Sequence, residues 1–311
     1  LRLIELNLKL NNPEKGFKLV QEGPAEQDFL LRALALFLQN EFTDQALRFF
    51  EVFDERILKS PQGKFYKALT LSKGGKDLDQ ALQLLDEIEP GQKMYAQVLS
   101  LKSRLFWDQG DLQQAVATAR QGQELFPDQE RFWLLQSEIL KSQGRPEQAL
   151  AVLQQAQKRF ENSLRVHFQA GVLEYELGQR QKALELMERV LEIDPGHAPA
   201  MNFIGYTLVE TGQDLQRAFG LISEALEKDP NNGYYLDSLA WYYYQREDFE
   251  KAWEVISSAL AAAAKDPVIW EHYAEIARKL GKTDEARQGY RKALELGAEN
   301  KKQLEQKLLG M

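Results

Sequence analysis

Apolar residues recur along most of this chain at intervals of three and four positions, the spacing of one face of an α-helix. No stretch of useful length alternates apolar and polar residues as a half-buried strand would. Gly and Pro interrupt the helical pattern at regular places and mark the turns between segments. The pattern therefore predicts an all-α fold.

One small residue returns at the same place in this pattern every 34 or 35 residues. The members of this series are Ala46, Ala81, Ala115, Ala149, Ala183, Ala218, Ala252 and Ala286. Gly110, Gly144, Gly178 and Gly281 lie five positions before their alanines, where a positive φ would end a helix. Each unit is thus predicted to be a pair of antiparallel helices that cross closely at the alanine. A larger side chain there would cost about 1–3 kcal/mol by overpacking.

The two ends of the chain depart from the repeat pattern. Glu41 and Lys76 take the place of the turn glycine in the first two units. Residues 1–26 are predicted to form a degenerate helical pair, broken at Asn12-Pro13. Residues 299–311 are predicted to form a capping helix. In that helix Leu304 and Leu308 are expected to cover the last repeat, with Lys301, Lys302, Glu305 and Lys307 facing water.

This combination of a large residue, a small one, a glycine turn, an alanine and a closing proline resembles the tetratricopeptide repeat (TPR). The resemblance covers roughly residues 27 to 300 and implies a right-handed superhelix of antiparallel helix pairs, forming one continuous solenoid. The repeats it implies are 27–61, 62–95, 96–129, 130–163, 164–197, 198–232, 233–266 and 267–298, which together span 27–298.

Composition limits the classes of partner. The chain has 39 Lys+Arg against 47 Asp+Glu, a net charge of −8, which disfavours binding to nucleic acid. The absence of cysteine excludes disulfides and thiolate metal sites. The longest apolar run in the chain, Ala259–Ala264, is too short to span a membrane. No signal segment stands at the start of the chain. Because the chain begins at Leu1, we expect a fragment or a processed form.

No motif for catalysis stands out. His167, His197 and His272 have no histidine four positions away that would complete a metal site, and His167 is better explained as a packing residue. Phosphate-binding loops, nucleophile elbows and zinc-protease helices are absent from the sequence. We therefore expect no enzyme activity, no cofactor and no metal.

The TPR resemblance implies that the first helix of each pair lines a concave groove, with the second, fifth, ninth and twelfth positions of each repeat facing it. Aromatic residues, which dominate binding hot spots, fill many of these positions. They are Trp107, Phe168, Tyr175, Tyr206, Tyr234, Trp241 and Tyr244. Asn202 could pair with the backbone of a bound peptide, and Arg104, Arg131 and Arg165 could form a cationic strip. The alternatives are that some rings pack against neighbouring helices and that the arginines are ordinary surface charge.

The expected partner is therefore a protein or an extended peptide. TPR domains that clamp the C-terminal carboxylates of chaperones resemble one another in having Lys at the fifth position. Ser100, Leu134, Phe168, Asn202, Asp237 and Glu271 occupy it here, so this ligand is disfavoured.

A narrower resemblance covers Asn202 to Ala252. The extra residue in the 211–217 turn, Gly205-Tyr206, and Leu236-Asp237-Ser238 followed by Trp241 resemble a group of Gram-negative TPR proteins, many of them outer-membrane lipoproteins. One member is an adaptor that activates a carboxyl-terminal processing protease. This resemblance implies a cell-envelope adaptor that holds a protease or another envelope enzyme with its substrate, at the periplasmic face of the outer membrane. The alternatives are a cytoplasmic or secretion- or pilus-associated chaperone or regulator, and a self-assembling structural protein.

Overall fold

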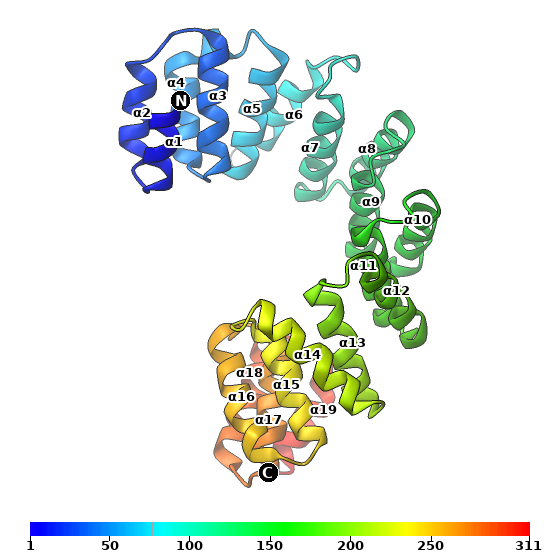
Figure 1. The fold of residues 1–311 in the computed structure, drawn as a ribbon. Coiled ribbons are helices and arrows are strands. Elements are labelled where there is room, and N and C mark those ends of the chain that lie inside the picture. The colour runs from blue at the N-terminus through cyan, green and yellow to red at the C-terminus, as the bar shows by residue number, and fades with distance from the viewer. Residues whose placement is uncertain (76) are drawn as a thin grey trace. The chain divides into compact units, whose positions relative to one another are not determined.

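The computed structural model describes residues 1–75 and 77–311, so Lys76, predicted to stand at a helix end, lies outside the described residues. The described residues form nineteen helices and no strand (Figure 1), which confirms the all-α prediction. The helices are α1 Arg2–Lys9, α2 Pro13–Gln21, α3 Gln27–Gln39, α4 Thr43–Ile57, α5 Pro61–Lys73, α6 Leu78–Asp86, α7 Tyr95–Asp108, α8 Leu112–Leu125, α9 Arg131–Ser142, α10 Pro146–Arg159, α11 Leu164–Glu176, α12 Arg180–Ile193, α13 Ala198–Thr211, α14 Leu215–Lys228, α15 Gly233–Gln245, α16 Phe249–Ala262, α17 Pro267–Lys279, α18 Thr283–Glu295 and α19 Lys301–Leu309.

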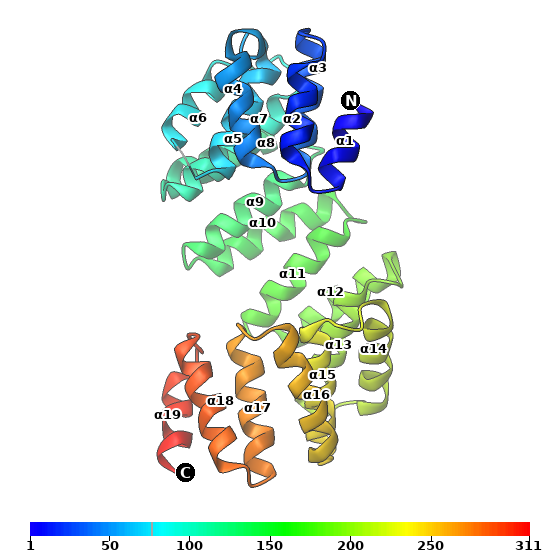
Figure 2. The same cartoon turned by 90° about the vertical axis from the view of Figure 1, so that its left-hand side faces the viewer.

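The helices fall into two compact units, Leu1–Arg159 and Phe160–Met311. In the second unit the pairs α11/α12, α13/α14, α15/α16 and α17/α18 each pack together, and α19 packs on α18. The first helices α13, α15 and α17 follow one another side by side (Figure 2). No helix in the described ranges combines the length and the apolar character needed to cross a lipid bilayer.

Helix pairs cross where the sequence places its periodic alanine. All members of the alanine series, from Ala46 to Ala286, are completely buried. In the α13/α14 pair, a Cβ atom on Gly205 would lie 3.1 Å from the Ala218 carbonyl oxygen and 2.6 Å from Ile222 Cγ1. The two helices thus meet backbone to backbone, and a side chain larger than alanine at either position would separate them.

Helix ends follow the predicted turn chemistry. Gly110, Gly144, Gly178 and Gly281 all have positive φ, which confirms their predicted role as helix stops. Glu41, at the equivalent position of the first repeat, adopts φ of 64° without being a glycine. The inserted turn uses Gly212, with φ of 66°, to end α13.

Both ends of the chain are closed by extra helices. The N-terminal pair α1/α2 breaks at Asn12-Pro13, and Phe17 of α2 packs edge-on against Phe37 and Phe49. At the other end Leu304 of α19 is completely buried, and Lys301, Lys302 and Glu305 are exposed.

The prediction that Lys307 faces water is wrong. Its Nζ lies 2.5 Å from Glu275 Oε1 and 3.4 Å from Glu271 Oε1, because α17 presents both carboxylates to α19. The capping helix is therefore held by an ion-pair cluster as well as by Leu304.

We predict that Ala218→Asp lowers the free energy of unfolding by about 3 kcal/mol or more, because it places an unpaired carboxylate between α13 and α14. Chemical denaturation of both proteins measures the loss. Gln216→Asp is the matched control, since it adds the same charge at an exposed position of α14. Equal stability of Ala218→Asp and wild type would contradict the close helix crossing.

Candidate functional site

Four successive first helices of the second unit enclose a cavity of about 380 Å³. The side chains come from α11, α13, α15 and the start of α17. The lining consists of Tyr175, Asn202, Tyr206, Tyr234, Asp237, Ser238, Asp266, Val268 and Ile269. Of the predicted groove residues, Tyr175, Asn202, Tyr206 and Tyr234 therefore lie together at this cavity.

Two tyrosines of the lining are held as neutral phenols. The Tyr175 hydroxyl donates a 2.6 Å hydrogen bond to Glu210 Oε2, and Arg180 pairs with the other oxygen of that carboxylate at 3.3 Å. Burial and then the hydrogen bond to Glu210 raise the pKa of Tyr175 well above its usual value. Burial, followed by neighbouring groups that include Asp237 and Glu210, raises the pKa of Tyr206 further still. Neither hydroxyl therefore ionises at physiological pH.

Asn202 brings a hydrogen-bond acceptor to the cavity. Its Oδ1 is buried, and no group within residues 1–75 or 77–311 donates a hydrogen bond to it. A buried acceptor without a donor costs about 1–3 kcal/mol. A ligand that supplies an N–H group at this atom would recover that energy.

Behind the cavity, Asp237 forms a buried pair with His272. His272 Nδ1 lies 2.8 Å from Asp237 Oδ1, and the two residues are 6% exposed. Burial alone would lower the pKa of His272, but the charge of Asp237 and the hydrogen bond to it outweigh burial and raise the pKa. Sequence analysis missed this role of His272, although its distance of 35 residues from Asp237 is one repeat length.

Trp241 and Tyr244 support this wall and do not line the cavity. The Trp241 ring stacks on His272, with centroids 4.1 Å apart, and on Tyr244, with centroids 4.4 Å apart. Both aromatic residues are half-buried. Trp241 thus packs on His272 and Tyr244 packs on Trp241, which is the alternative considered above for some of the rings.

The open side of the cavity is formed by Tyr234 and Val268, which are 57% and 48% exposed. Asp266 is the N-cap of α17, and its Oδ1 accepts hydrogen bonds from the backbone N–H of Val268 and of Ile269. This cap holds the first turn of α17, which contributes Val268 and Ile269 to the lining. Sequence analysis did not select Asp266, Ser238 or Ile269, because they stand outside the four groove positions.

The other predicted residues do not contribute to the lining of this cavity. Phe168 is half-buried beside the His197 ring, at 5.4 Å, and Arg165 is exposed on α11. In the first unit, Trp107 packs on a cluster that contains Ala115, and Arg104 is exposed. Arg131 is half-buried there and lies over the Phe132 ring at 5.2 Å, and burial lowers its pKa. None of these residues lines the cavity of the second unit.

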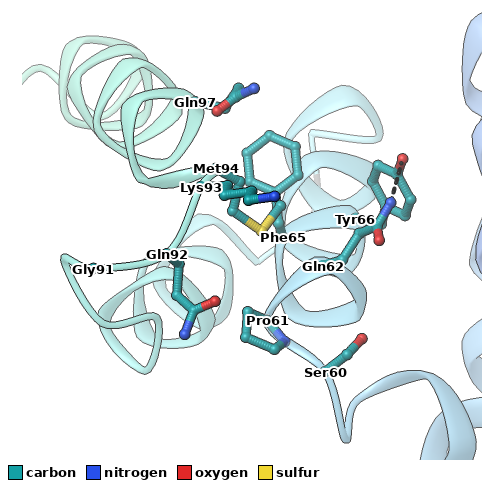
Figure 3. Close-up of a pocket in the computed structure, with 10 residues that line it drawn as sticks. All are labelled: Ser60, Pro61, Gln62, Phe65, Tyr66, Gly91, Gln92, Lys93, Met94 and Gln97. Atoms are coloured by element: carbon teal, nitrogen blue, oxygen red, sulfur yellow. Dashed lines mark hydrogen bonds between the residues drawn. The ribbon is translucent and has the colours of Figure 1, made fainter. Parts of the chain in front are cut away.

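The first unit has a separate cavity of about 610 Å³ between the start of α5 and the loop before α7 (Figure 3). Its lining is Ser60, Pro61, Gln62, Phe65, Tyr66, Gly91, Gln92, Lys93, Met94 and Gln97. Figure 3 shows Phe65 and Met94 close together, with the glutamine side chains around them. Ser60 Oγ already caps α5 by accepting from the Gly63 N–H. None of the aromatic, asparagine or arginine residues predicted for the groove lines this cavity, so we take the cavity of the second unit as the candidate site.

Comparison with known proteins supports the repeat fold. Models described as tetratricopeptide repeat match residues 101–163 and 140–202, and a model described as anaphase-promoting complex, cyclosome, subunit 3 matches residues 211–293. No curated protein matches the chain in sequence.

Several solved structures share the arrangement of helices. A tetratricopeptide repeat protein from Parabacteroides merdae ATCC 43184 is 16% identical, with a TM-score of 0.63, over 80% of this chain and 98% of that one. PilW, a type IV pilus biogenesis factor, is 16% identical, with a TM-score of 0.54, over 64% and 92%. A thermophilic TPR protein from Thermus thermophilus is 22% identical, with a TM-score of 0.50, over 58% and 98%. At these identities the likeness shows the fold alone.

We predict a pH-dependent contribution of the His272–Asp237 pair to stability. Because the pKa of His272 is raised on folding, the pair stabilises the fold fully below about pH 6.5, the ordinary histidine pKa. That contribution is lost as the pH rises through the raised pKa. Urea unfolding of wild type and His272→Gln between about pH 5.5 and 9 should show a steeper loss of stability for wild type. His197→Asn, at the N-cap of α13, is the control, and parallel curves for wild type and His272→Gln would contradict the assignment.

Proposed function

We propose that this chain, which is a solenoid of tetratricopeptide repeats, acts as a non-catalytic scaffold that binds a protein or an extended peptide at the cavity of its second unit. The observation that carries the proposal is the convergence of Tyr175, Asn202, Tyr206 and Tyr234 on one cavity. TPR solenoids are protein-interaction scaffolds, so a binding role agrees with the fold.

The composition of the cavity suits a peptide. Tyrosine rings offer a large contact area with little loss of conformational entropy, and aromatic residues dominate binding hot spots. Tyr234 and Val268 are exposed although both are large and apolar, and both belong to the lining. Asn202 Oδ1 can accept a hydrogen bond from an N–H group of the bound segment. Rings for contact and an acceptor for orientation are the two parts that a peptide site needs.

The segment 202–252 supports a more specific proposal. The residues that set it apart from a generic repeat include Asp237 and Ser238, and both line the cavity. Gly205, from the same segment, makes the close contact with α14. We therefore infer a cell-envelope adaptor that brings a partner enzyme, such as a protease, together with its substrate. The resemblance of residues 202–252 supports this role, and partner capture tests it.

We predict that Tyr234→Ala combined with Val268→Ala lowers partner recovery at least about tenfold, since two exposed hot-spot side chains are removed. The measurement is affinity capture from envelope and soluble fractions with the wild-type chain and the double variant as baits. Phe219→Ala is the matched control, because Phe219 is 39% exposed on α14 and outside the cavity. Circular dichroism confirms equal helix content.

The identity of the captured protein tests the narrower role. A protease or cell-wall enzyme, lost with the double variant, supports the adaptor. Secretion or pilus subunits in its place would replace the adaptor with a chaperone. Full recovery by the double variant would contradict binding at this cavity.

A further inference from the structure

We propose that the cavity of the second unit recognises a basic side chain, the ammonium group of lysine or the guanidinium group of arginine, in the bound segment. This inference rests on the proposed function, because it names the chemistry of the ligand at the same site. The lining contains two carboxylates, from Asp237 and Asp266, and three tyrosines. None of its residues is Lys or Arg.

Two hydroxyl groups of the lining, those of Tyr175 and Ser238, present oxygen atoms rather than free protons. The Tyr175 hydroxyl donates its hydrogen bond to Glu210 Oε2 at 2.6 Å, and the Ser238 hydroxyl donates to the Tyr234 carbonyl oxygen at 3.0 Å. Asn202 Oδ1 is buried without a donor among the described residues. A ligand that brings several N–H donors therefore matches the cavity, and lysine and arginine bring about three and five.

The charges around the cavity favour a cation. Asp237, Asp266 and Glu210 lie in or beside the lining, and Glu271 is close enough to raise the pKa of Tyr206. Three of these carboxylates each have a basic partner, Asp237 with His272, Glu210 with Arg180 and Glu271 with Lys307. Among the described residues, Asp266 accepts only from backbone N–H groups and therefore supplies the excess negative charge of the lining. Tyrosine rings add to this preference, because their faces attract cations.

The last repeat of the same unit already holds a lysine in this way. Lys307 of α19 lies 2.5 Å from Glu275 Oε1, and its Nζ is 5.5 Å from the centroid of the Tyr290 ring. The Tyr290 hydroxyl donates to that carboxylate at 2.7 Å. Beside it, the amide of Asn300 binds Glu271 at 3.0 Å. The cavity contains the same kinds of group, a carboxylate, a tyrosine and an asparagine, with no lysine of its own.

Other side chains fit this lining less well. An apolar side chain would gain nothing from Asn202 Oδ1, which would stay without a donor, and it would take Asp237 and Asp266 further from water. An acidic side chain would meet the carboxylates directly. A basic side chain lets its methylene groups contact Tyr234 and Val268 while its charged end reaches the acceptors.

The first arm of the test is selection of a random nonapeptide library displayed on phage against the full chain. We expect the selected peptides to share a Lys or Arg at one position. Binding of a selected synthetic peptide, measured by calorimetry, should weaken at least about tenfold when that residue is replaced by norleucine, and equally when a lysine is acetylated. Arginine in place of lysine should retain binding.

The second arm locates the contact on the protein. Asn202→Leu should weaken the basic peptide about tenfold and leave the norleucine peptide unchanged, whereas Asn231→Leu, at an exposed asparagine outside the lining, should affect neither. Tyr234→Leu, at an exposed position, is a second variant should Asn202→Leu fail to fold.

The two proposals fail in different ways. The preference for a cation would be overturned if the selected peptides lack a basic residue, or if they bind as well with norleucine or acetyl-lysine in its place. If those peptides still lose binding to Tyr234→Leu, the binding site itself remains supported. Peptides whose binding ignores Asn202 and Tyr234 would overturn both.

Discussion

The close crossing of two helices at a buried alanine is the constraint on which the rest of this structure depends. At α13/α14 a Cβ atom on Gly205 would approach the Ala218 carbonyl oxygen to 3.1 Å, so the helix backbones are almost in contact. The repeat interval of 34 or 35 residues reproduces this crossing along the chain. Equivalent positions of successive first helices are therefore neighbours, and each helix pair gains its core from the next.

The candidate site is a direct product of that period. The hydrogen bonds from Tyr175 to Glu210 and between His272 and Asp237 each join residues 35 positions apart. These bonds fix the walls of the cavity and leave Asn202 Oδ1 and the exposed faces of Tyr234 and Val268 for a ligand. A preorganised binding site has side chains that are already held in place and a polar group that still lacks a partner. Few side chains then lose conformational freedom when the ligand binds.

Much of the fold follows from local pattern, since helix spacing, small crossing residues and turn glycines each act within one repeat. The groove positions also select Tyr175, Asn202, Tyr206 and Tyr234, because these positions repeat with the helices. Whether an aromatic side chain at such a position is open or covered depends on the next repeat, which a single position does not encode. Trp241 stacks on His272, and Trp107 and Phe168 pack against neighbouring helices, for this reason. Lys307 of α19 pairs with Glu275 of α17, a tertiary contact that the pattern of α19 does not contain.

The central claim is that partners bind at the cavity of residues 160–311, and site-specific photo-crosslinking tests it most directly. A benzophenone amino acid would replace Tyr234, at the open side of the cavity, or Phe219, an exposed aromatic outside it. After irradiation with the captured partner, mass spectrometry would map the adducts. We expect an adduct at position 234, next to a Lys or Arg of the partner, and none at position 219. Adducts at position 219 alone, or at the glutamines of the first-unit cavity when the probe is placed there, would contradict the assignment.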